Sequence, residues 1–315
     1  MLNQGLSSLF LKHDEQSGTT THQCTPKQPY DQPEAATGAN LILGIEEPEL
    51  YLHPSRQRHV ARILLQLAEG SIPGVAQRTQ VIYGTHSPLF VGIDRGDKVR
   101  VLRKVEVGKD QPQEARVSAA TMDDINRTLE QASNAPAGSY TAVSTRARLK
   151  TIMTPWMNEG FFAHVVVLVE GEEDRALLMG AAAMEDIDFD SLEISVIPAG
   201  GKRSLDRPAA IFKGLNIPTY IIWDSDSGKN GAKPEDNHRL LRLCEQEVED
   251  WPSQIASHFA CFERNFGATV SDEIGEELWN QLLIESRDHF EYPENDSAQK
   301  NPAVVERVVR KATDG

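Results

Sequence analysis

The sequence predicts an α/β protein whose strands form largely parallel sheets, and three observations lead to this fold class. A continuous apolar run, His164–Val169, is typical of a strand buried on both faces of a sheet. Strand and helix patterns alternate along much of the chain, which favours parallel pairing. Paired carboxylates stand where two of the expected strands end. Ligands of parallel sheets gather at the carboxyl ends of the strands, so these acids mark candidate sites.

Residues 1–105 form the first predicted domain, with the order strand, helix, strand, strand. Within it, residues 12–40 are rich in Gln, Thr, Pro, Asp and Gly and are predicted to be a flexible insertion. The expected elements are a strand ending at Glu46, an amphipathic helix at Ser55–Glu69, and strands at Val81–Thr85 and Lys98–Leu102. Residues 106–160 are predicted to be a linker with helical segments.

Residues 161–315 form the second predicted domain, an alternating α/β block followed by helical additions. Its expected elements are strands at His164–Val169, Leu192–Ile197, Pro218–Trp223 and Ser257–Phe262, and helices at Glu172–Met184 and Arg207–Leu215.

Composition bounds the class of protein. The chain has 315 residues, 39% hydrophobic and 25% charged, as in globular proteins. A net charge of −15 argues against binding nucleic acid through overall positive charge, although a local basic groove stays compatible with it. Three scattered cysteines, and the lack of an apolar stretch of transmembrane length, predict a cytoplasmic protein without a membrane partner.

The first candidate site consists of Glu46, Glu47 and His86. An ATP site needs a carboxylate that holds Mg²⁺ and a group that orients the attacking water. Adjacent acids at the end of a buried strand can supply both, and a histidine after the neighbouring strand can touch the γ-phosphate. The alternative is that each strand leaves the sheet through ordinary polar residues.

Flanking residues favour the ATPase interpretation. The segment from Glu46 through Pro54 resembles the Walker B and D-loop segment of ABC-type ATPases of the SMC and Rad50-like branch, and Thr85–Pro88 resembles their switch-histidine motif. The resemblance implies that Glu46 holds Mg²⁺ and Glu47 positions water. The chain contains no phosphate loop of the form G-x-x-x-x-G-K-[ST], so ATP is expected only if a Walker A half is supplied.

The second candidate site gathers four carboxylates at the ends of two expected strands. Glu170 and Asp174 are four residues apart, about one helical turn, and Asp224 and Asp226 would share one side of an extended chain. Unit charges about 4 Å apart repel by roughly 4 kcal/mol at an effective dielectric of about 20. Such a cluster must protonate, separate or bind cations, and its oxygens favour Mg²⁺, Mn²⁺ or Ca²⁺. The alternative is that these acids only cap helices and turns.

The pattern Val169–Asp174 followed by Asp224-Ser225-Asp226 resembles the Toprim domain of topoisomerases, primases and related nucleases. A partial ABC-type ATPase sheet followed by such a Rossmann-like parallel sheet resembles the OLD (overcoming lysogenisation defect) nuclease family, over most of residues 41–230. The resemblance implies DNA cleavage with two divalent metal ions, Mg²⁺ or Mn²⁺. It carries Glu170, Asp174, Asp224 and Asp226 over as metal ligands, with Ser225 and Ser227 as hydrogen-bonding helpers.

Two later residues also enter through the resemblance. Glu263, after the expected strand ending at Phe262, would complete the second metal site, unless it is an ordinary surface glutamate. Lys300 would lie near the scissile phosphate as a catalytic residue, whereas a lone late lysine is more often merely solvated. Lys202 and Arg203 follow the Gly200-Gly201 turn and would either contact phosphate or simply be exposed.

The leading hypothesis is therefore an OLD-family DNA endonuclease or nickase whose incomplete ATPase half serves regulation or dimerisation. Its expected partners are DNA and either a second copy of the chain or a partner chain carrying Walker A. One alternative is a truncated, catalytically idle regulatory or interaction protein. Another is a Toprim enzyme of the primase or topoisomerase type, for which zinc-finger cysteines and an obvious nucleophilic tyrosine are missing.

Overall fold

The computed structural model describes residues 40–72, 76, 78–108, 112–152, 154–293 and 297–313. The predicted insertion at 12–40 lies outside the described residues, apart from Asn40 at its end. The chain divides into two compact units, one formed by Met1–Leu43 and Gln66–Gln80 and the other by Gly44–Leu65 and Val81–Gly315.

The elements of the first predicted domain match the expectation with one exception. They are β1 (Asn40–Glu46), α1 (Pro54–Ala68), β2 (Arg78–Gly84), a 3-10 helix η1 (Ile93–Lys98) and β3 (Val101–Val105). Strands β1 and β2 form a two-stranded sheet. The strand expected at Lys98–Leu102 is wrong in position, since Lys98 ends η1 and pairing starts at Val101.

The register of β3 explains this shift. Val101 lies opposite Ser118 in an antiparallel pair with β4 (Glu114–Ser118), a strand the sequence did not reveal. Before it, the amide of Val99 donates to the carbonyl of Gly96 and closes η1. Both strands carry several charged residues, which hides the apolar alternation that predicts a strand.

The second predicted domain is built on a five-stranded sheet of order β6-β5-β7-β9-β8. Its strands are β5 (Val165–Val169), β6 (Ile194–Pro198), β7 (Thr219–Asp224), β8 (Gln254–Ile255) and β9 (Phe259–Phe262). Strands β6, β5, β7 and β9 run parallel, and only the short β8 is antiparallel to its neighbour. The mixed α/β fold with a mainly parallel sheet is therefore confirmed.

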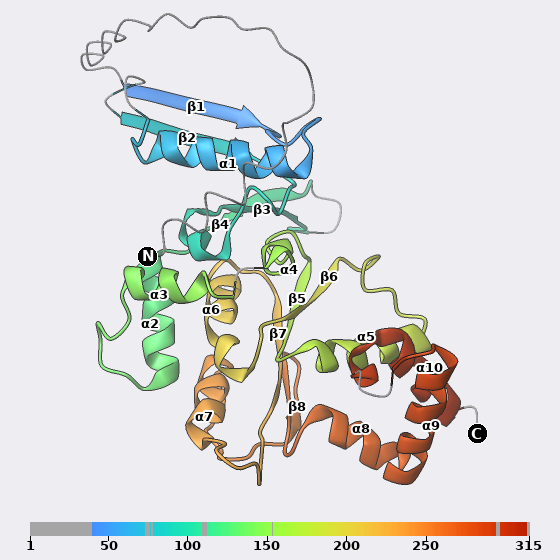
Figure 1. Cartoon of the computed structure of the whole chain (residues 1–315). Coiled ribbons are helices and arrows are strands. Elements are labelled where there is room, and N and C mark those ends of the chain that lie inside the picture. Colours follow the sequence, from blue (N-terminus) through green and yellow to red (C-terminus); the bar gives the residue numbers. More distant parts are fainter. Residues whose placement is uncertain are drawn as a thin grey trace, which may run out of the picture. The chain divides into compact units, whose positions relative to one another are not determined.

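Helices flank this sheet, and the alternation along its strands decides which side chain faces which layer. Their bounds are α2 (Met122–Ser133), α3 (Ala142–Leu149), α4 (Pro155–Glu159), α5 (Glu172–Met184), η2 (Lys202–Ser204), α6 (Asp206–Gly214), α7 (Pro234–Leu243), α8 (Phe266–Ile274), α9 (Glu276–His289), η3 (Ala298–Lys300) and α10 (Pro302–Thr313). In Figure 1, α6 and α7 lie on one side of the sheet, and α5 with α9 and α10 lies on the other.

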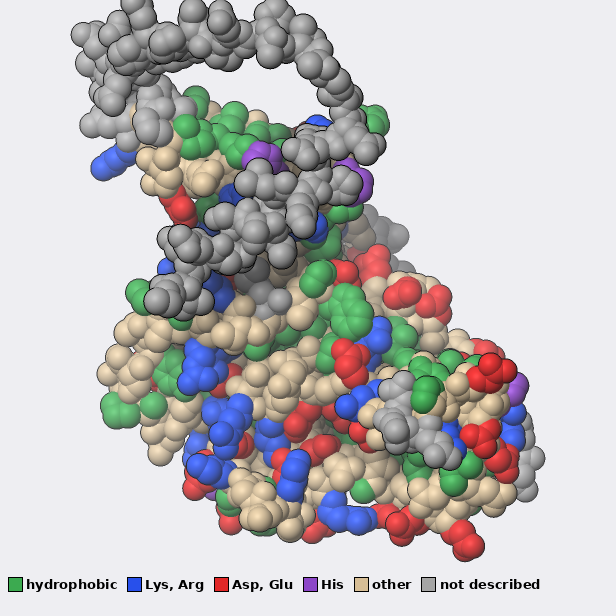
Figure 2. Space-filling model, in the orientation of Figure 1, with side chains coloured by type: hydrophobic (Ala, Val, Ile, Leu, Met, Phe, Trp, Pro, Cys, Tyr) green, Lys and Arg blue, Asp and Glu red, His purple; other side chains and the backbone are tan. Residues whose placement is uncertain are grey.

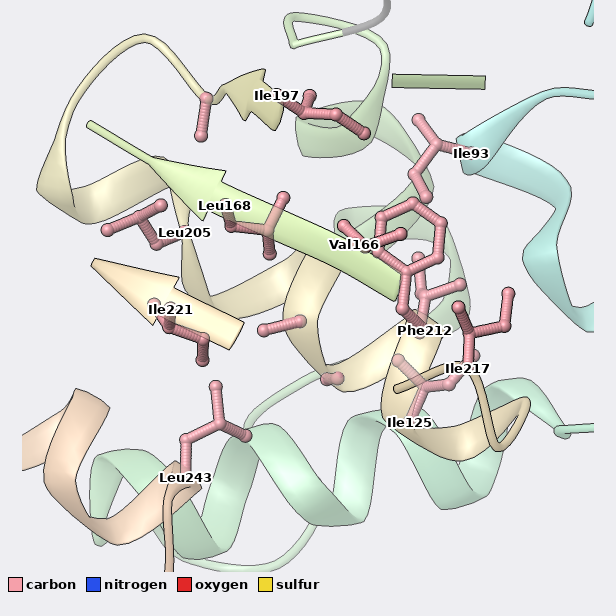
Figure 3. Packing of buried hydrophobic residues seen from close by; sticks show 14 of the residues in the cluster. Ile93, Ile125, Val166, Leu168, Ile197, Leu205, Phe212, Ile217, Ile221 and Leu243 are labelled. Atoms are coloured by element: carbon pink, nitrogen blue, oxygen red, sulfur yellow. The ribbon is translucent and has the colours of Figure 1, made fainter. Parts of the chain in front are cut away.

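The larger core lies between the sheet and α2, α6 and α7. Val166 and Leu168 of β5 belong to this core, and Figure 3 shows Val166 on the side of β5 toward Phe212 of α6. Val167 and Val169, the alternate residues of the same strand, belong to a second cluster on the opposite face. A strand that is apolar on both faces in this way holds its carboxyl end firmly, which matters for the residue that follows it.

A close helix contact fixes the far side of α5. A Cβ atom on Gly180 would lie 2.8 Å from the amide nitrogen of Glu306 and 2.9 Å from Val305 Cγ1 of α10. Only a glycine lets the two helices approach this closely. The contact with α10 therefore holds the C-terminal half of α5, the helix whose first turn carries candidate site residues. Among the described helices, none is both long and apolar enough to cross a membrane.

Candidate active site

The carboxyl ends of β5 and β7 lie side by side, because the two strands pair directly. Glu170 follows β5, and Asp224 is the last residue of β7. Glu170 Oε1 accepts a hydrogen bond from the amide of Asp224 at 2.9 Å, and its Oε2 accepts one from the amide of Lys202 at 3.1 Å. One carboxylate thus ties together the loops that follow β5, β6 and β7.

Asp174 approaches the same edge from α5. It is the third residue of the helix, and its Oδ2 accepts a hydrogen bond from the amide of Gly171 at 2.9 Å. The predicted geometry is wrong in one respect: Glu170 precedes the helix, so a helical turn does not relate the two acids. The capping interaction with Gly171 brings Asp174 back toward Glu170 instead. Asp174 thus caps α5, and its carboxylate still lies near the other acids.

Asp226 is held differently from the expectation. The chain after Asp224 is not extended, since Asp226 has a φ of 62° in the left-handed region. Each of its two carboxylate oxygens forms an ion pair with a lysine: Oδ2 lies 2.7 Å from Lys202 Nζ, and Oδ1 lies 2.8 Å from Lys229 Nζ. Tertiary pairing, rather than strand alternation, sets the direction of this side chain.

Burial and mutual repulsion shape the protonation of the cluster. Burial raises the pKa of Glu170 to about 7, and the charges of Asp226 and Asp174 act in the same direction. A hydrogen bond from the Asp224 amide and the charge of Lys202 oppose this rise. Burial and the charges of Asp174, Glu170 and Asp226 likewise raise the pKa of Asp224 to about 7. The pKa of Asp174 is also raised, again through burial. The charge of Asp174 thus hinders the ionisation of both Glu170 and Asp224, and the charge of Glu170 also hinders that of Asp224.

Asp226 behaves in the opposite way. Burial raises its pKa, but the hydrogen bonds and charges of Lys202 and Lys229 together outweigh burial and hold the pKa below its ordinary value. Asp226 is thus the ionised, cation-paired member of a cluster whose other members repel one another.

Lys202 is the residue whose role sequence reasoning missed. Its side chain is only 9% exposed, and its Nζ reaches both Asp226 and, at 3.2 Å, Asn237 Oδ1. The amide of buried Asn237 in turn donates to the backbone carbonyls of Ser225 and Asp250. The Gly200-Gly201-Lys202 turn was a visible signal, but it pointed to phosphate rather than to an acid partner.

The remaining predicted residues lie around this cluster. Glu263 is exposed, and its carbonyl accepts from the amide of Ser227 at 2.8 Å, so it stands next to the Asp226 loop. Lys300, also exposed, lies close enough to Glu173 of α5 for its charge to lower the pKa of that acid, which burial and Asp174 raise. The expected help from the Ser225 hydroxyl is wrong, because this buried group donates to the carbonyl of Pro252.

The carboxylate oxygens of this cluster are the type of ligand that a hard divalent cation prefers. Glu170, Asp174 and Asp224 offer oxygens only, and within the described part of the chain none of them forms an ion pair within 4.0 Å. Their repulsion is what a bound cation would relieve. As the side chains are placed, no three His, Cys, Asp or Glu residues in the described ranges form a ready metal-binding group. The fit therefore rests on donor type and unrelieved repulsion.

The first candidate site is more open. The amide of Glu47 donates to the carbonyl of Gly84, and Glu47 Oε1 lies 3.8 Å from Nε2 of the largely exposed His86. Glu49, which the prediction did not single out, accepts from Thr85 Oγ1 at 2.8 Å and from the amide of His86 at 2.7 Å. Although partial burial raises its pKa, these bonds lower it overall. Glu49 is what joins the acid segment to the histidine segment.

Two family models match the chain in the predicted order. Residues 29–91 match a model described as an AAA ATPase domain. Residues 161–226 match the Toprim domain of overcoming lysogenization defect protein-like proteins, a span that contains all four carboxylates of the second site.

Curated relatives agree with these matches. The chain is 29% identical over 222 residues to an OLD nuclease of Thermus scotoductus, which covers 70% of this chain and 38% of that protein. It is 25% identical over 208 residues to the Old nuclease of Escherichia phage P2, which covers 66% of this chain and 31% of that protein. The chain thus spans well under half the length of the curated relatives it matches.

Among solved structures, the C-terminal region of the Burkholderia pseudomallei OLD protein is similar at 26% identity, over 47% of this chain and 74% of that one, with a TM-score of 0.31. At this score the superposition adds nothing to the sequence matches. Two family models in the expected order and two curated OLD nucleases support the identification of this chain as an OLD-family protein.

Proposed function

We propose that the chain hydrolyses phosphodiester bonds in DNA, with divalent metal ions held by Glu170, Asp174, Asp224 and Asp226. The observation that carries this proposal is the hydrogen-bonded pair of Glu170 and Asp224, whose pKa values both rise to about 7 at the shared edge of β5 and β7. Strongly shifted pKa values cluster at functional sites, where burial and like charges act together as they do on Glu170 and Asp224. The names of the curated relatives, both nucleases, support the same activity.

Each residue would have a distinct part in this reaction. Glu170 would orient the site, since it accepts from the loops after β6 and β7. Lys202 would hold Asp226 ionised and turned toward the cluster. Glu263 would extend the ligand set toward a second ion, and Lys300, beside α5, would face the phosphate. When bound, Mg²⁺ or Mn²⁺ would activate a water molecule and stabilise the leaving oxygen.

Plasmid nicking tests the proposal. Wild-type protein should convert supercoiled plasmid to open circles with Mg²⁺ or Mn²⁺. Asp224→Asn keeps an oxygen that can accept from the amide of Phe266, yet it removes the charge, so cleavage should fall at least about 100-fold. Asp288→Asn, at an exposed carboxylate of α9, is the matched control and should cleave normally. Equal cleavage by wild type and Asp224→Asn would sink the nuclease assignment and favour an idle interaction protein.

We also propose that Glu46, Glu47 and His86 form half of a nucleotide site, which serves regulation or dimerisation. The Glu47–His86 approach and the Glu49 bonds to Thr85 and His86 support this, because they bring the segment after β1 to the segment after β2. The chain alone should bind labelled ATP no better than a Glu47→Gln variant does. A partner chain that brings a Walker A loop should create ATP hydrolysis, which the Glu47→Gln variant should lack because Glu47 is the residue expected to position water. The cytoplasmic location also stays a prediction.

A further inference from the structure

A pocket of about 380 Å³ opens beside Asp226, and Glu170, Asp174 and Asp224 are not among the residues that line it. Its walls are two loops, residues 200–204 and 229–233, together with Asp226 and Asp236. Its size falls in the range of small-ligand and subsite pockets, about 300–1,000 Å³. We call it the basic pocket, and the proposed nuclease function leaves it without a role.

The charge of the basic pocket runs against that of the chain. Lys202, Arg203, Lys229 and Lys233 line it, against two acids, whereas the whole chain carries a net charge of −15. On the face drawn in Figure 2, Lys and Arg side chains are interspersed with Asp and Glu side chains over the lower part of the molecule. A site of this sign attracts anions that the rest of the surface repels.

Three of the four basic groups are available to a ligand. Lys202 is not, because it is buried and bound to Asp226 and Asn237. The side chain of Lys229 is 71% exposed in its pair with Asp226. Its exposed ammonium group can contact an incoming phosphate, while the partly buried Asp226 keeps Lys202 as a partner.

Arg203 and Lys233 are freer still. The side chain of Arg203 is 63% exposed and contacts Asp236, which also contacts Arg239 at 3.2 Å and so keeps a partner if Arg203 turns away. Lys233 is exposed at the residue before α7, and the described contacts give its ammonium group no ion pair. Both side chains are exposed at the pocket, and Asp236 keeps Arg239 as a partner if Arg203 turns to a ligand.

The position of the pocket decides which anion it fits. Asp226 and Lys202 belong both to the pocket and to the carboxylate cluster, so the two are contiguous. Phosphates of one DNA strand recur about every 3.4 Å along the helix axis, so a strand cleaved at the carboxylates must place neighbouring phosphates close by. A pocket with several mobile cations and no demanding geometry suits a backbone phosphate, which positions the strand without reading its sequence.

We propose that the basic pocket binds a backbone phosphate of duplex DNA next to the cleaved bond, through Arg203, Lys229 and Lys233. The proposal rests on the nuclease function and names the contacts that hold its substrate. It assigns Lys202 to Asp226 rather than to DNA, although Lys202 lines the same pocket.

The test measures DNA binding without cleavage. Fluorescence anisotropy with a labelled duplex in Ca²⁺, between 50 and 200 mM salt, gives the affinity and its salt dependence. Arg203→Ala with Lys233→Ala should weaken binding about tenfold and reduce the magnitude of the slope of log K against log salt by about 1, because one phosphate contact worth about 0.9 is lost. Arg148→Ala with Lys150→Ala, two exposed cations at the end of α3, is the matched control and should change neither.

The outcomes separate this inference from the function it rests on. If wild type binds the duplex and the pocket variant keeps the same slope, the pocket assignment is overturned while the nuclease proposal stands. If wild type binds no DNA, both fall. Inorganic phosphate is the competing probe, and its binding to the wild type and to the Arg203→Ala, Lys233→Ala variant is measured by calorimetry. If the variant loses phosphate binding but binds DNA as the wild type does, the pocket belongs to free phosphate and the inference is overturned. Thermal melting of both double variants checks that each is folded.

Discussion

Asp224→Asn should make the metal-free chain more stable at pH 8, although it should slow cleavage. The pKa of Asp224 rises from 3.8 to about 7 in the folded state, with burial as the main cause. A group whose folded pKa is raised contributes stability that is lost as pH climbs from the unfolded pKa through the folded one. At about 1.4 kcal/mol for each pKa unit, ionised Asp224 costs the folded wild type up to about 4 kcal/mol above pH 7.

Asparagine removes this cost because it carries no charge. The expected gain at pH 8 is about 2 to 4 kcal/mol, since Asp224 and Glu170 repel each other and part of the cost belongs to the pair. At pH 5 the gain should be less than half as large, because wild-type Asp224 is then mostly protonated in the folded state.

Urea unfolding in EDTA measures the gain. The signal is the fluorescence of tryptophan, which includes the fully buried Trp223 next to Asp224 on β7. Asp288→Asn should leave stability unchanged at both pH values. A variant at Asp224 that is no more stable than wild type at pH 8, or a gain of equal size at pH 5, would refute the reasoning about burial and repulsion.

The other predictions concern the neighbourhood of this cluster. Lys202→Met removes the buried cation from Asp226, so the chain should lose about 3 kcal/mol of stability in urea unfolding and cleave more slowly; wild-type behaviour would contradict the pairing. Gly180→Ala should lower the melting temperature by the equivalent of about 1–3 kcal/mol, because the added methyl meets Val305 and the α10 backbone, and a raised melting temperature would show that α5 and α10 separate easily. EDTA should stop plasmid nicking and added Mn²⁺ should restore it; cleavage that persists in EDTA would exclude a divalent-metal mechanism.

Much of the sheet could be predicted from the sequence because its strands are apolar on both faces. The helix expected at Glu172–Met184 has those bounds in the structure, and β5, β6, β7 and β9 lie within two residues of their expected positions. The β3–β4 pair was missed or misplaced because Arg103, Lys104 and Arg116 interrupt the apolar pattern. Exposed antiparallel strands depend on pairing partners that a local pattern does not contain.

The residues of the candidate site could be predicted from the sequence, but the contacts between their side chains could not. Glu170 and Asp224 could be expected to meet once their strands were neighbours, and the pairing of β5 with β7 makes them so. The left-handed backbone of Asp226 and its pairing with Lys202 could not be expected, since both depend on a loop from a different strand. The metal-binding and catalytic roles of these residues stay predictions.

The central claim is that the carboxylates at the carboxyl edge of β5 and β7 hold divalent cations. Anomalous diffraction from a crystal soaked in Mn²⁺ tests it directly, because it locates the ion independently of activity. We predict an anomalous peak between the carboxylates of Glu170, Asp224 and Asp226, with a second toward Asp174 or Glu263. A Mn²⁺-soaked crystal without a peak at these carboxylates, or with its only peak near Glu46 and Glu47, would contradict it.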